Sequence, residues 1–220
     1  LALMSVLSQG DEVLVTDNVY QPTRALCDGL LARMGITTRY VDPRIGADIA
    51  KLVGPRTRAL FLESPGSITF EVHDLPAIAA ALDGSNVAIM IDNTWATPLF
   101  HRPLQLGADL VIHSGTKMFV GHSDALFGTV SANAKWAGAL AGTHRTLGLI
   151  ASPDDTYLAT RGIRTLALRM EEHSRRSLAL ANWLEARDGV SAVLHPGLAS
   201  HPDHAVFTRD FSGSGCLFSF

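Results

Sequence analysis

The first half of the chain alternates between short apolar runs and longer amphipathic segments. The short runs are rich in Val, Ile and aromatic residues, which favour strands, and the segments between them favour helices. Strands that alternate with helices form crossover units, which give a mostly parallel sheet covered on both faces. We therefore predict an α/β fold with strands over residues 12–17, 37–42, 58–64, 87–92 and 109–114.

Capping residues indicate where the helices begin and end. The segment 22–35 has proline in its first turn and glycine at its end, which predicts a helix between the first two strands. We expect Asp74 to open the next helix, and Ser152 to cap a third because acidic residues follow it. From there to about Arg187 we predict a largely helical stretch with a break at Gly162.

The character of the sequence changes after this helical stretch. Residues 190–197 are typical of a strand, a loop rich in Pro, His and Asp follows, and the last residues indicate another strand. We predict a large domain over 1–162 and the start of a smaller C-terminal α+β domain over 163–220. The chain opens like the second half of a helix and closes like an unfinished strand, so we expect it to be a piece of a longer protein.

Composition excludes several classes of function. The 220 residues carry 18 basic and 21 acidic side chains without a basic stripe, so we expect no nucleic-acid partner. No apolar run approaches the roughly 20 residues that cross a bilayer, so we expect no membrane partner. Cys27 and Cys216 lie far apart and fit reduced thiols in a cytoplasmic protein better than a disulfide framework. His113 and His122 lack the spacing of metal ligands, so we expect no metal site.

Asp92 ends the fourth predicted strand, at the edge where open α/β sheets bind their ligands. A carboxylate at the end of a buried strand is costly unless it meets a cation. The protonated ring nitrogen of pyridoxal phosphate (PLP) is such a cation, and an aspartate beside it keeps the ring able to accept electrons. The alternative is that Asp92 only starts a turn or caps a helix.

Lys117 follows the fifth predicted strand, in the run LVIHSGTKMFVGH. Apolar neighbours would desolvate its amine and favour the neutral form, which is nucleophilic toward an aldehyde. Alternatively, its stem packs while its head reaches water. Ser114 and Thr116 offer hydroxyls, and Gly115 a backbone N–H, to a phosphate, although the glycine spacing of a P-loop is absent. Tyr20, after the first strand, either stacks on a planar cofactor or merely covers the edge of the core.

Five segments occur in order along nearly the whole chain: SQGDEVLVTDNVYQPTR, LESPGSITFEVHDLPAI, MIDNTWATPLF, SGTKMFVGHSDALFGTV and TRGIRTLALRM. Together they resemble the Cys/Met-metabolism family of PLP-dependent enzymes. The resemblance implies PLP fold type I, the aspartate-aminotransferase-like architecture, with pyridoxal 5'-phosphate as cofactor. It also implies a small amino-acid substrate and a homotetramer built as a dimer of dimers, with active sites at the dimer interface.

The resemblance also implies a role for each candidate residue. Lys117 becomes the lysine that binds the cofactor covalently and acts as the catalytic base. Asp92 becomes the partner of the pyridine nitrogen, and Ser114 and Thr116 become ligands of the phosphate. Tyr20 becomes the ring that stacks on the cofactor and a second candidate proton donor in catalysis.

The segment Gly66-Ser67-Ile68 bears on the reaction. Many γ-acting members of the family carry Thr-Asn-Pro there, so the resemblance implies a carbon–sulfur lyase that cleaves L-cystathionine by β-elimination. Other activities of the same family stay open, namely γ-lyase, γ-synthase and O-acylhomoserine sulfhydrylase, because a shared fold does not separate them. A non-catalytic α/β binding protein is a more distant alternative.

Overall fold

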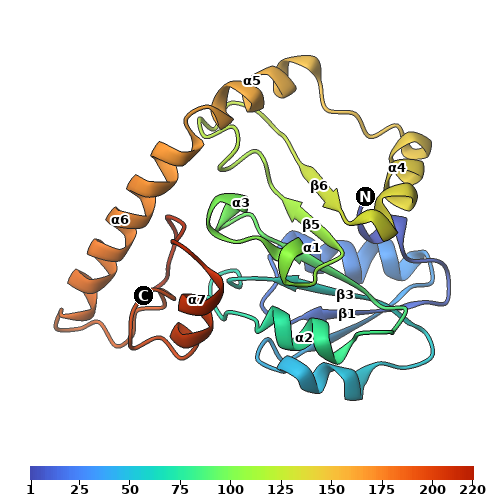
Figure 1. Cartoon of the computed structure of the whole chain (residues 1–220), viewed down its shortest axis with the longest axis horizontal. Coiled ribbons are helices and arrows are strands. Elements are labelled where there is room, and N and C mark those ends of the chain that lie inside the picture. The colour runs from blue at the N-terminus through green and yellow to red at the C-terminus, as the bar shows by residue number, and fades with distance from the viewer.

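The computed structural model describes residues 1–220, and a six-stranded sheet forms its centre (Figure 1). The strands are β1 Glu12–Thr16, β2 Thr37–Val41, β3 Thr57–Glu63, β4 Ala88–Asp92, β5 Leu110–His113 and β6 Thr129–Ala132. They lie in the order β2-β1-β3-β4-β5-β6. The first five are parallel and β6 is antiparallel to β5, which confirms the predicted α/β fold.

The five predicted strands are all present, each within one residue of its predicted bounds. The sequence analysis missed β6, which pairs with β5 from His113↔Thr129 to Leu110↔Ala132. Its four residues, TVSA, contain one large apolar side chain, and none of them is fully buried. A strand this short and polar carries no periodic apolar signal, so only its pairing with β5 reveals it.

Helices connect and cover the strands. The α-helices are α1 Gln21–Ala25, α2 Leu75–Ala81, α3 Thr97–Phe100, α4 Ala134–Leu147, α5 Pro153–Ile163, α6 Leu166–Glu185 and α7 His204–Asp210. Short 3₁₀-helices are η1 Leu3–Ser5, η3 Gly46–Leu52 and η4 Pro103–Leu106, and the π-helical turn η2 Leu26–Leu31 continues α1. The helix expected over 22–35 is therefore present, with a π-helical turn in its middle.

The predicted caps are present. The Asp74 carboxylate accepts from Ala77 N at 3.1 Å at the start of α2. The Ser152 hydroxyl accepts from Asp155 N at 3.0 Å at the start of α5. The break between α5 and α6 comes just after Gly162, at residues 164–165.

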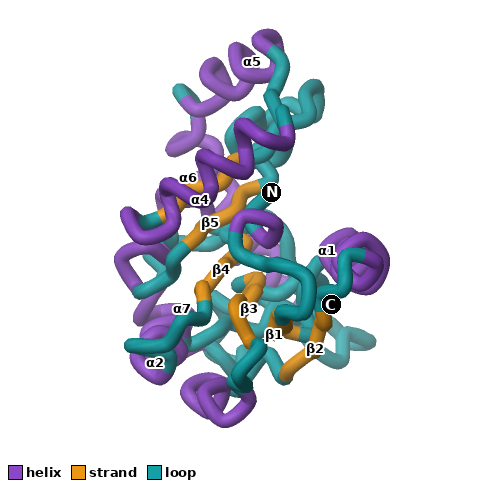
Figure 2. The backbone as a smooth tube through the Cα atoms, turned by 90° about the vertical axis from the view of Figure 1, so that its right-hand side faces the viewer, coloured by secondary structure: helices purple, strands orange, loops and turns teal.

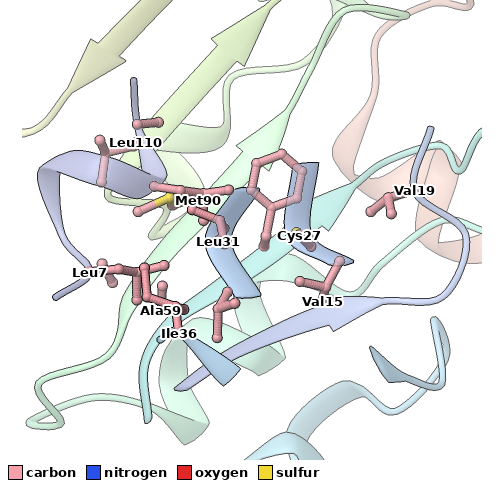
Figure 3. Close-up of a cluster of buried hydrophobic side chains, with 14 residues drawn as sticks. Leu7, Val15, Val19, Cys27, Leu31, Ile36, Ala59, Met90 and Leu110 are labelled. Atoms are coloured by element: carbon pink, nitrogen blue, oxygen red, sulfur yellow. The ribbon is translucent and has the colours of Figure 1, made fainter. Parts of the chain in front are cut away.

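The core has two layers because successive strand residues point to opposite faces of the sheet. Val15 packs on one face with Cys27 and Leu31 of η2 (Figure 3), and Val13 belongs to the same cluster. Leu14, between the two valines, packs on the other face with residues of α2 and η3. Figure 2 shows helices on both sides of the strands, as the crossover pattern requires.

The strand predicted over 190–197 is wrong. Only Leu194 is paired, in a single antiparallel bridge with Ser219, and the last residues likewise form no strand. A strand needs a ladder of neighbours to satisfy its backbone, and this segment has one. The apolar side chains of this part of the chain pack against a helix, because Val193 and Leu198 contact Ala181 and Leu184 of α6.

The arm formed by α5 and α6 leads away from the sheet, and α7 returns beside it (Figure 1). Asp203, before α7, binds Arg44 through two hydrogen bonds of 2.8 and 2.9 Å and also accepts from Val72 N. These contacts hold the segment before α7 against the loops that follow β2 and β3. The division into domains near residue 162 stays a prediction. None of the helices is both long enough and apolar enough to span a membrane.

Candidate active site

The carboxyl ends of three neighbouring strands meet at one edge of the sheet. Glu63 ends β3 and Asp92 ends β4, and the two are direct neighbours across the strand pair. Ser114 follows β5 immediately, and its backbone N–H donates to Thr94 Oγ1 at 2.7 Å. Because open α/β sheets bind ligands at this edge, these residues define the candidate site.

Asp92 is a largely buried carboxylate at this edge. Its Oδ1 accepts from the backbone N–H of Thr94 at 2.8 Å. Burial raises the pKa of Asp92, while the bonds from Thr94 and the positive charge of Lys117 oppose the rise. A cation placed against the carboxylate would relieve the cost of burying its charge. Asp92 therefore both starts a turn and remains able to bind a cationic ring nitrogen.

Thr94 is a site residue that the sequence analysis missed. Its backbone N–H holds Asp92 and its hydroxyl accepts from Ser114 N, so one residue links the ends of β4 and β5. A threonine two residues after a strand-ending aspartate is typical of an Asx turn, and that was the available signal. The hydrogen bond to Ser114 forms because β4 and β5 are adjacent in the sheet. This adjacency cannot be predicted from the sequence around Thr94.

Lys117 lies in a tight turn after β5. Its backbone N–H donates to Ser114 O at 3.0 Å, and its carbonyl accepts from Gly121 N at 2.8 Å. The turn buries Met118 and Val120 but leaves Lys117 exposed. The expectation that apolar neighbours desolvate the amine is therefore wrong for this chain, because those neighbours point into the core and the lysine points out of it.

Tyr20 and Lys117 come together although their strands are not adjacent. The Nζ atom of Lys117 lies 5.1 Å from the centroid of the Tyr20 ring, a distance that suits a cation–π contact. Tyr20 as a whole is 49% exposed, so it is accessible at this edge of the sheet. Stacking on a planar cofactor therefore stays a prediction for Tyr20, beside the alternative that it covers the edge of the core.

The two hydroxyl residues of the turn are held differently. Ser114 is bound through its backbone N–H and C=O, which leaves its hydroxyl for another partner. The Thr116 hydroxyl accepts from Phe127 N at 2.8 Å and donates to Phe127 O at 3.2 Å. Thr116 therefore ties the turn to the segment before β6, and its proton would have to leave Phe127 to reach a phosphate.

Glu63 is the second residue that the sequence analysis missed as a member of the site. Its Oε2 accepts from the backbone N–H of Tyr20 at 2.7 Å. Burial and the neighbouring Asp92 raise the pKa of Glu63 from 4.5 to about 7. The available signal was the same as for Asp92, an acidic residue that ends a buried apolar strand.

A cavity of about 840 Å³ opens beside the turn. Lys117 and Thr116 line one side, Arg169 and His173 of α6 line another, and Cys216 approaches from the last segment of the chain. The cavity therefore brings the sheet edge together with residues beyond the predicted boundary at 162. Its size is in the range of sites for small molecules.

These groups match what PLP requires. Lys117 offers an amine for the aldehyde, Asp92 a carboxylate for the ring nitrogen, and Tyr20 a half-exposed aromatic ring beside the amine. Asp92 is buried without an ion pair, as expected of a carboxylate whose cation belongs to a ligand. A mostly parallel α/β sheet with this set of groups at its carboxyl edge defines the class of PLP-dependent enzymes.

Comparison with known proteins places the chain more narrowly. The family model described as "Cys/Met metabolism PLP-dependent enzyme" matches residues 1–220. The chain belongs to this family, which confirms the family, the fold and the cofactor expected from the sequence.

Relatives with assigned names and solved structures agree with this placement. The cystathionine beta-lyase MetC of Escherichia coli is 43% identical over 221 residues, covering 100% of this chain and 56% of the relative. The structure of metB from Corynebacterium glutamicum has a TM-score of 0.95 and 32% identity, covering 99% of this chain and 57% of that one. The structure of cystathionine gamma-lyase from Lactobacillus plantarum complexed with L-serine has a TM-score of 0.93 and 32% identity, covering 96% and 56%. The chain thus spans little more than half the length of these relatives.

Proposed function

We propose that this protein is a PLP-dependent carbon–sulfur lyase that cleaves L-cystathionine and water to homocysteine, pyruvate and ammonia by β-elimination. The observation that carries the proposal is the arrangement of Lys117, Tyr20 and Asp92 at the carboxyl edge of the sheet. The 43% identity to a cystathionine beta-lyase along the whole chain supports this reaction over others in the family.

PLP, when bound, supplies a conjugated ring that accepts the electron pair left at the substrate Cα. Lys117 Nζ is the base that removes the Cα proton, because it is the amine at this edge. Asp92 would hold the ring nitrogen protonated, and Ser114 and Thr116 would bind the phosphate. Tyr20 would cover one face of the ring. The sulfur leaves Cβ with a proton from Lys117 or from the Tyr20 hydroxyl.

The segment Gly66-Ser67-Ile68, on whose resemblance the choice of β-elimination rests, is packed closely against Asn18. A Cβ atom on Gly66 would overlap the side chain of Asn18, lying 2.7 Å from its Cβ. Asn18 also accepts from Ser67 N at 2.8 Å through its carbonyl, and it is only two residues from Tyr20. The loop is therefore fitted closely to the segment that carries Tyr20, and a threonine at position 66 would not fit without displacing Asn18.

A γ-lyase is the second candidate, and the structural match to cystathionine gamma-lyase favours it. γ-Elimination requires a second proton abstraction, at Cβ, so Lys117 would have to serve two carbons in turn. Incubation with cystathionine separates the candidates, because β-cleavage yields pyruvate and γ-cleavage yields 2-oxobutyrate. We expect pyruvate, and a predominance of 2-oxobutyrate with cysteine would contradict the proposal. If neither product formed and no visible chromophore developed with PLP, a non-catalytic binding protein would be the better account.

Three further expectations belong to this proposal. We propose a homotetramer built as a dimer of dimers, as the family resemblance implies. We propose a cytoplasmic location, which the two free cysteines Cys27 and Cys216 support. We also propose that residues 163–220 begin a second domain, which the small apolar cluster of Ala181, Leu184, Val193 and Leu198 supports.

A further inference from the structure

Glu63 has an unusual environment for a glutamate. It ends β3, next to Asp92, and its side chain forms one hydrogen bond, from the backbone N–H of Tyr20. No arginine or lysine forms an ion pair with it. The positive charge of Lys117 acts on Glu63 but does not offset burial and the charge of Asp92, which together raise the pKa of Glu63. Burying a carboxylate beside a second carboxylate without an ion pair is costly.

The bond from Tyr20 acts where the chain turns away from the sheet. Tyr20 precedes α1 with φ −54° and ψ 138°, outside helical geometry, and its carbonyl accepts from Thr23 N at 2.9 Å. The side chain of Tyr20, the N-cap residue, forms no capping hydrogen bond with α1. The Glu63 carboxylate therefore holds the N–H side of Tyr20, and α1 holds the carbonyl side.

The backbone of Glu63 is also held in place, through its carbonyl oxygen. The His73 ring is buried and lies between two carbonyl oxygens, 2.6 Å from Pro43 O and 2.9 Å from Glu63 O. This contact anchors the end of β3 from behind. A continuous path of contacts therefore runs from His73 through Glu63 to Tyr20, whose ring lies against the amine of Lys117.

We propose that Glu63 is a positioning residue that sets the place of the Tyr20 ring relative to Lys117, through its hydrogen bond to the Tyr20 backbone. The inference rests on the proposed function, since the ring is positioned for a cofactor. The role depends on the reach of the side chain and on an acceptor oxygen, and it does not depend on the negative charge. Reach and charge can be varied separately by conservative substitution.

Glu63→Gln keeps the length and one acceptor oxygen but removes the charge. Glu63→Asp keeps the charge but shortens the side chain by one methylene, so the oxygen falls short of Tyr20 N. Glu171→Gln, at an exposed position on α6, is the matched control for loss of a carboxylate. PLP is first removed from each variant, and the PLP-free protein is then titrated with PLP. The dissociation constant of PLP is read from the visible absorbance. Circular dichroism shows that each variant is folded.

We expect Glu63→Gln and Glu171→Gln to bind PLP within about twofold of the wild type. We expect Glu63→Asp to bind it about tenfold more weakly, because loss of one well-placed hydrogen bond has effects of that order. Combining Glu63→Asp with Tyr20→Leu should weaken binding no further than Tyr20→Leu alone, since both changes act through the same ring. If Glu63→Gln bound PLP weakly and Glu63→Asp bound it normally, the proposal would be overturned, because the role of Glu63 would then depend on its charge.

The PLP titration needs no turnover, so it separates this inference from the proposed reaction. If the affinities followed the expected order but cystathionine was not cleaved, the reaction would be wrong and the role of Glu63 would stand. If cystathionine was cleaved normally and the affinities of all variants were equal, Glu63 would have no positioning role.

Discussion

Lys117 and Tyr20 meet across the carboxyl edge of the sheet, with Nζ 5.1 Å from the ring centroid. Tyr20 follows β1 and Lys117 follows β5, and in the sheet β3 and β4 lie between those strands. The two intervening strands end in Glu63 and Asp92. The amine, the ring and the two carboxyl groups therefore occupy one site because of the strand order.

Asp92→Asn should leave the fold and PLP binding intact but reduce cystathionine turnover about a hundredfold or more, on the scale of preorganised electrostatic effects. The amide is nearly the same size as the carboxylate but cannot keep the ring nitrogen protonated. Steady-state kcat together with the PLP dissociation constant checks this. Asp83→Asn, at an exposed position, is the control. A kcat near that of the wild type would show that Asp92 serves only as a turn residue.

Gly162→Ala should destabilise the protein and disturb the turn that carries Lys117. A Cβ at this position would overlap the carbonyl oxygens of Phe119 and Val120, which are backbone atoms and cannot rotate away. Overpacking of this kind costs about 1–3 kcal/mol. Gly138→Ala, in α4 with open space around it, should instead stabilise by up to about 1 kcal/mol. Denaturant unfolding of both variants measures the difference, and equal stabilities would contradict the packing described here.

The raised pKa of Glu63 predicts that the stability of the protein depends on pH. Its pKa is raised from 4.5 to about 7 in the folded protein, so the folded state binds this proton more tightly than the unfolded chain. The resulting stability is present below pH 4.5 and is lost as the pH rises through about 7. Glutamine does not titrate, so Glu63→Gln lacks this loss of stability. The free energy of unfolding of the variant minus that of the wild type should therefore rise by on the order of 2 kcal/mol between pH 5 and pH 8. If the difference in free energy of unfolding between variant and wild type did not change with pH, the pKa of Glu63 would not be raised in the folded protein.

Gly66→Thr tests the fit of the loop against Asn18. The added side chain must displace Asn18, which is 5% exposed and donates to Glu71 Oε2 at 3.3 Å. We expect a loss of about 1–3 kcal/mol in stability and a lower rate of pyruvate formation. Gly142→Ala, which meets no neighbour, is the control for a new side chain. Wild-type stability and product formation in Gly66→Thr would mean that glycine at this position does not distinguish the reactions.

The sequence predicts this fold well where the signal is local. The strands β1, β3, β4 and β5 each contain a run of buried apolar residues, and the caps Asp74 and Ser152 have short-range partners. The strand β6 and the segment 190–197 were mispredicted because pairing decides them: one finds a partner in β5 and the other has a single bridge.

The site was predictable to the same extent. Asp92, Lys117 and Tyr20 stand out because Asp92 ends a recognisable strand and the other two follow one. Glu63 and Thr94 did not, because their importance comes from contacts between neighbouring strand ends, and the order of the strands decides which ends are neighbours. The exposure of Lys117 was also mispredicted, since the direction of a side chain in a tight turn does not follow from the polarity of its neighbours.

The measurement that tests the account most directly is the position of the covalent bond to PLP. The PLP-loaded protein is reduced with borohydride, digested and mapped by mass spectrometry, with Lys117→Ala treated in parallel. The chain has only two other lysines, Lys51 and Lys135, and both are exposed. We predict that the pyridoxyl group is found on Lys117, and that Lys117→Ala carries no label and no visible chromophore. A label on Lys51 or Lys135, or an unchanged chromophore in Lys117→Ala, would contradict the account.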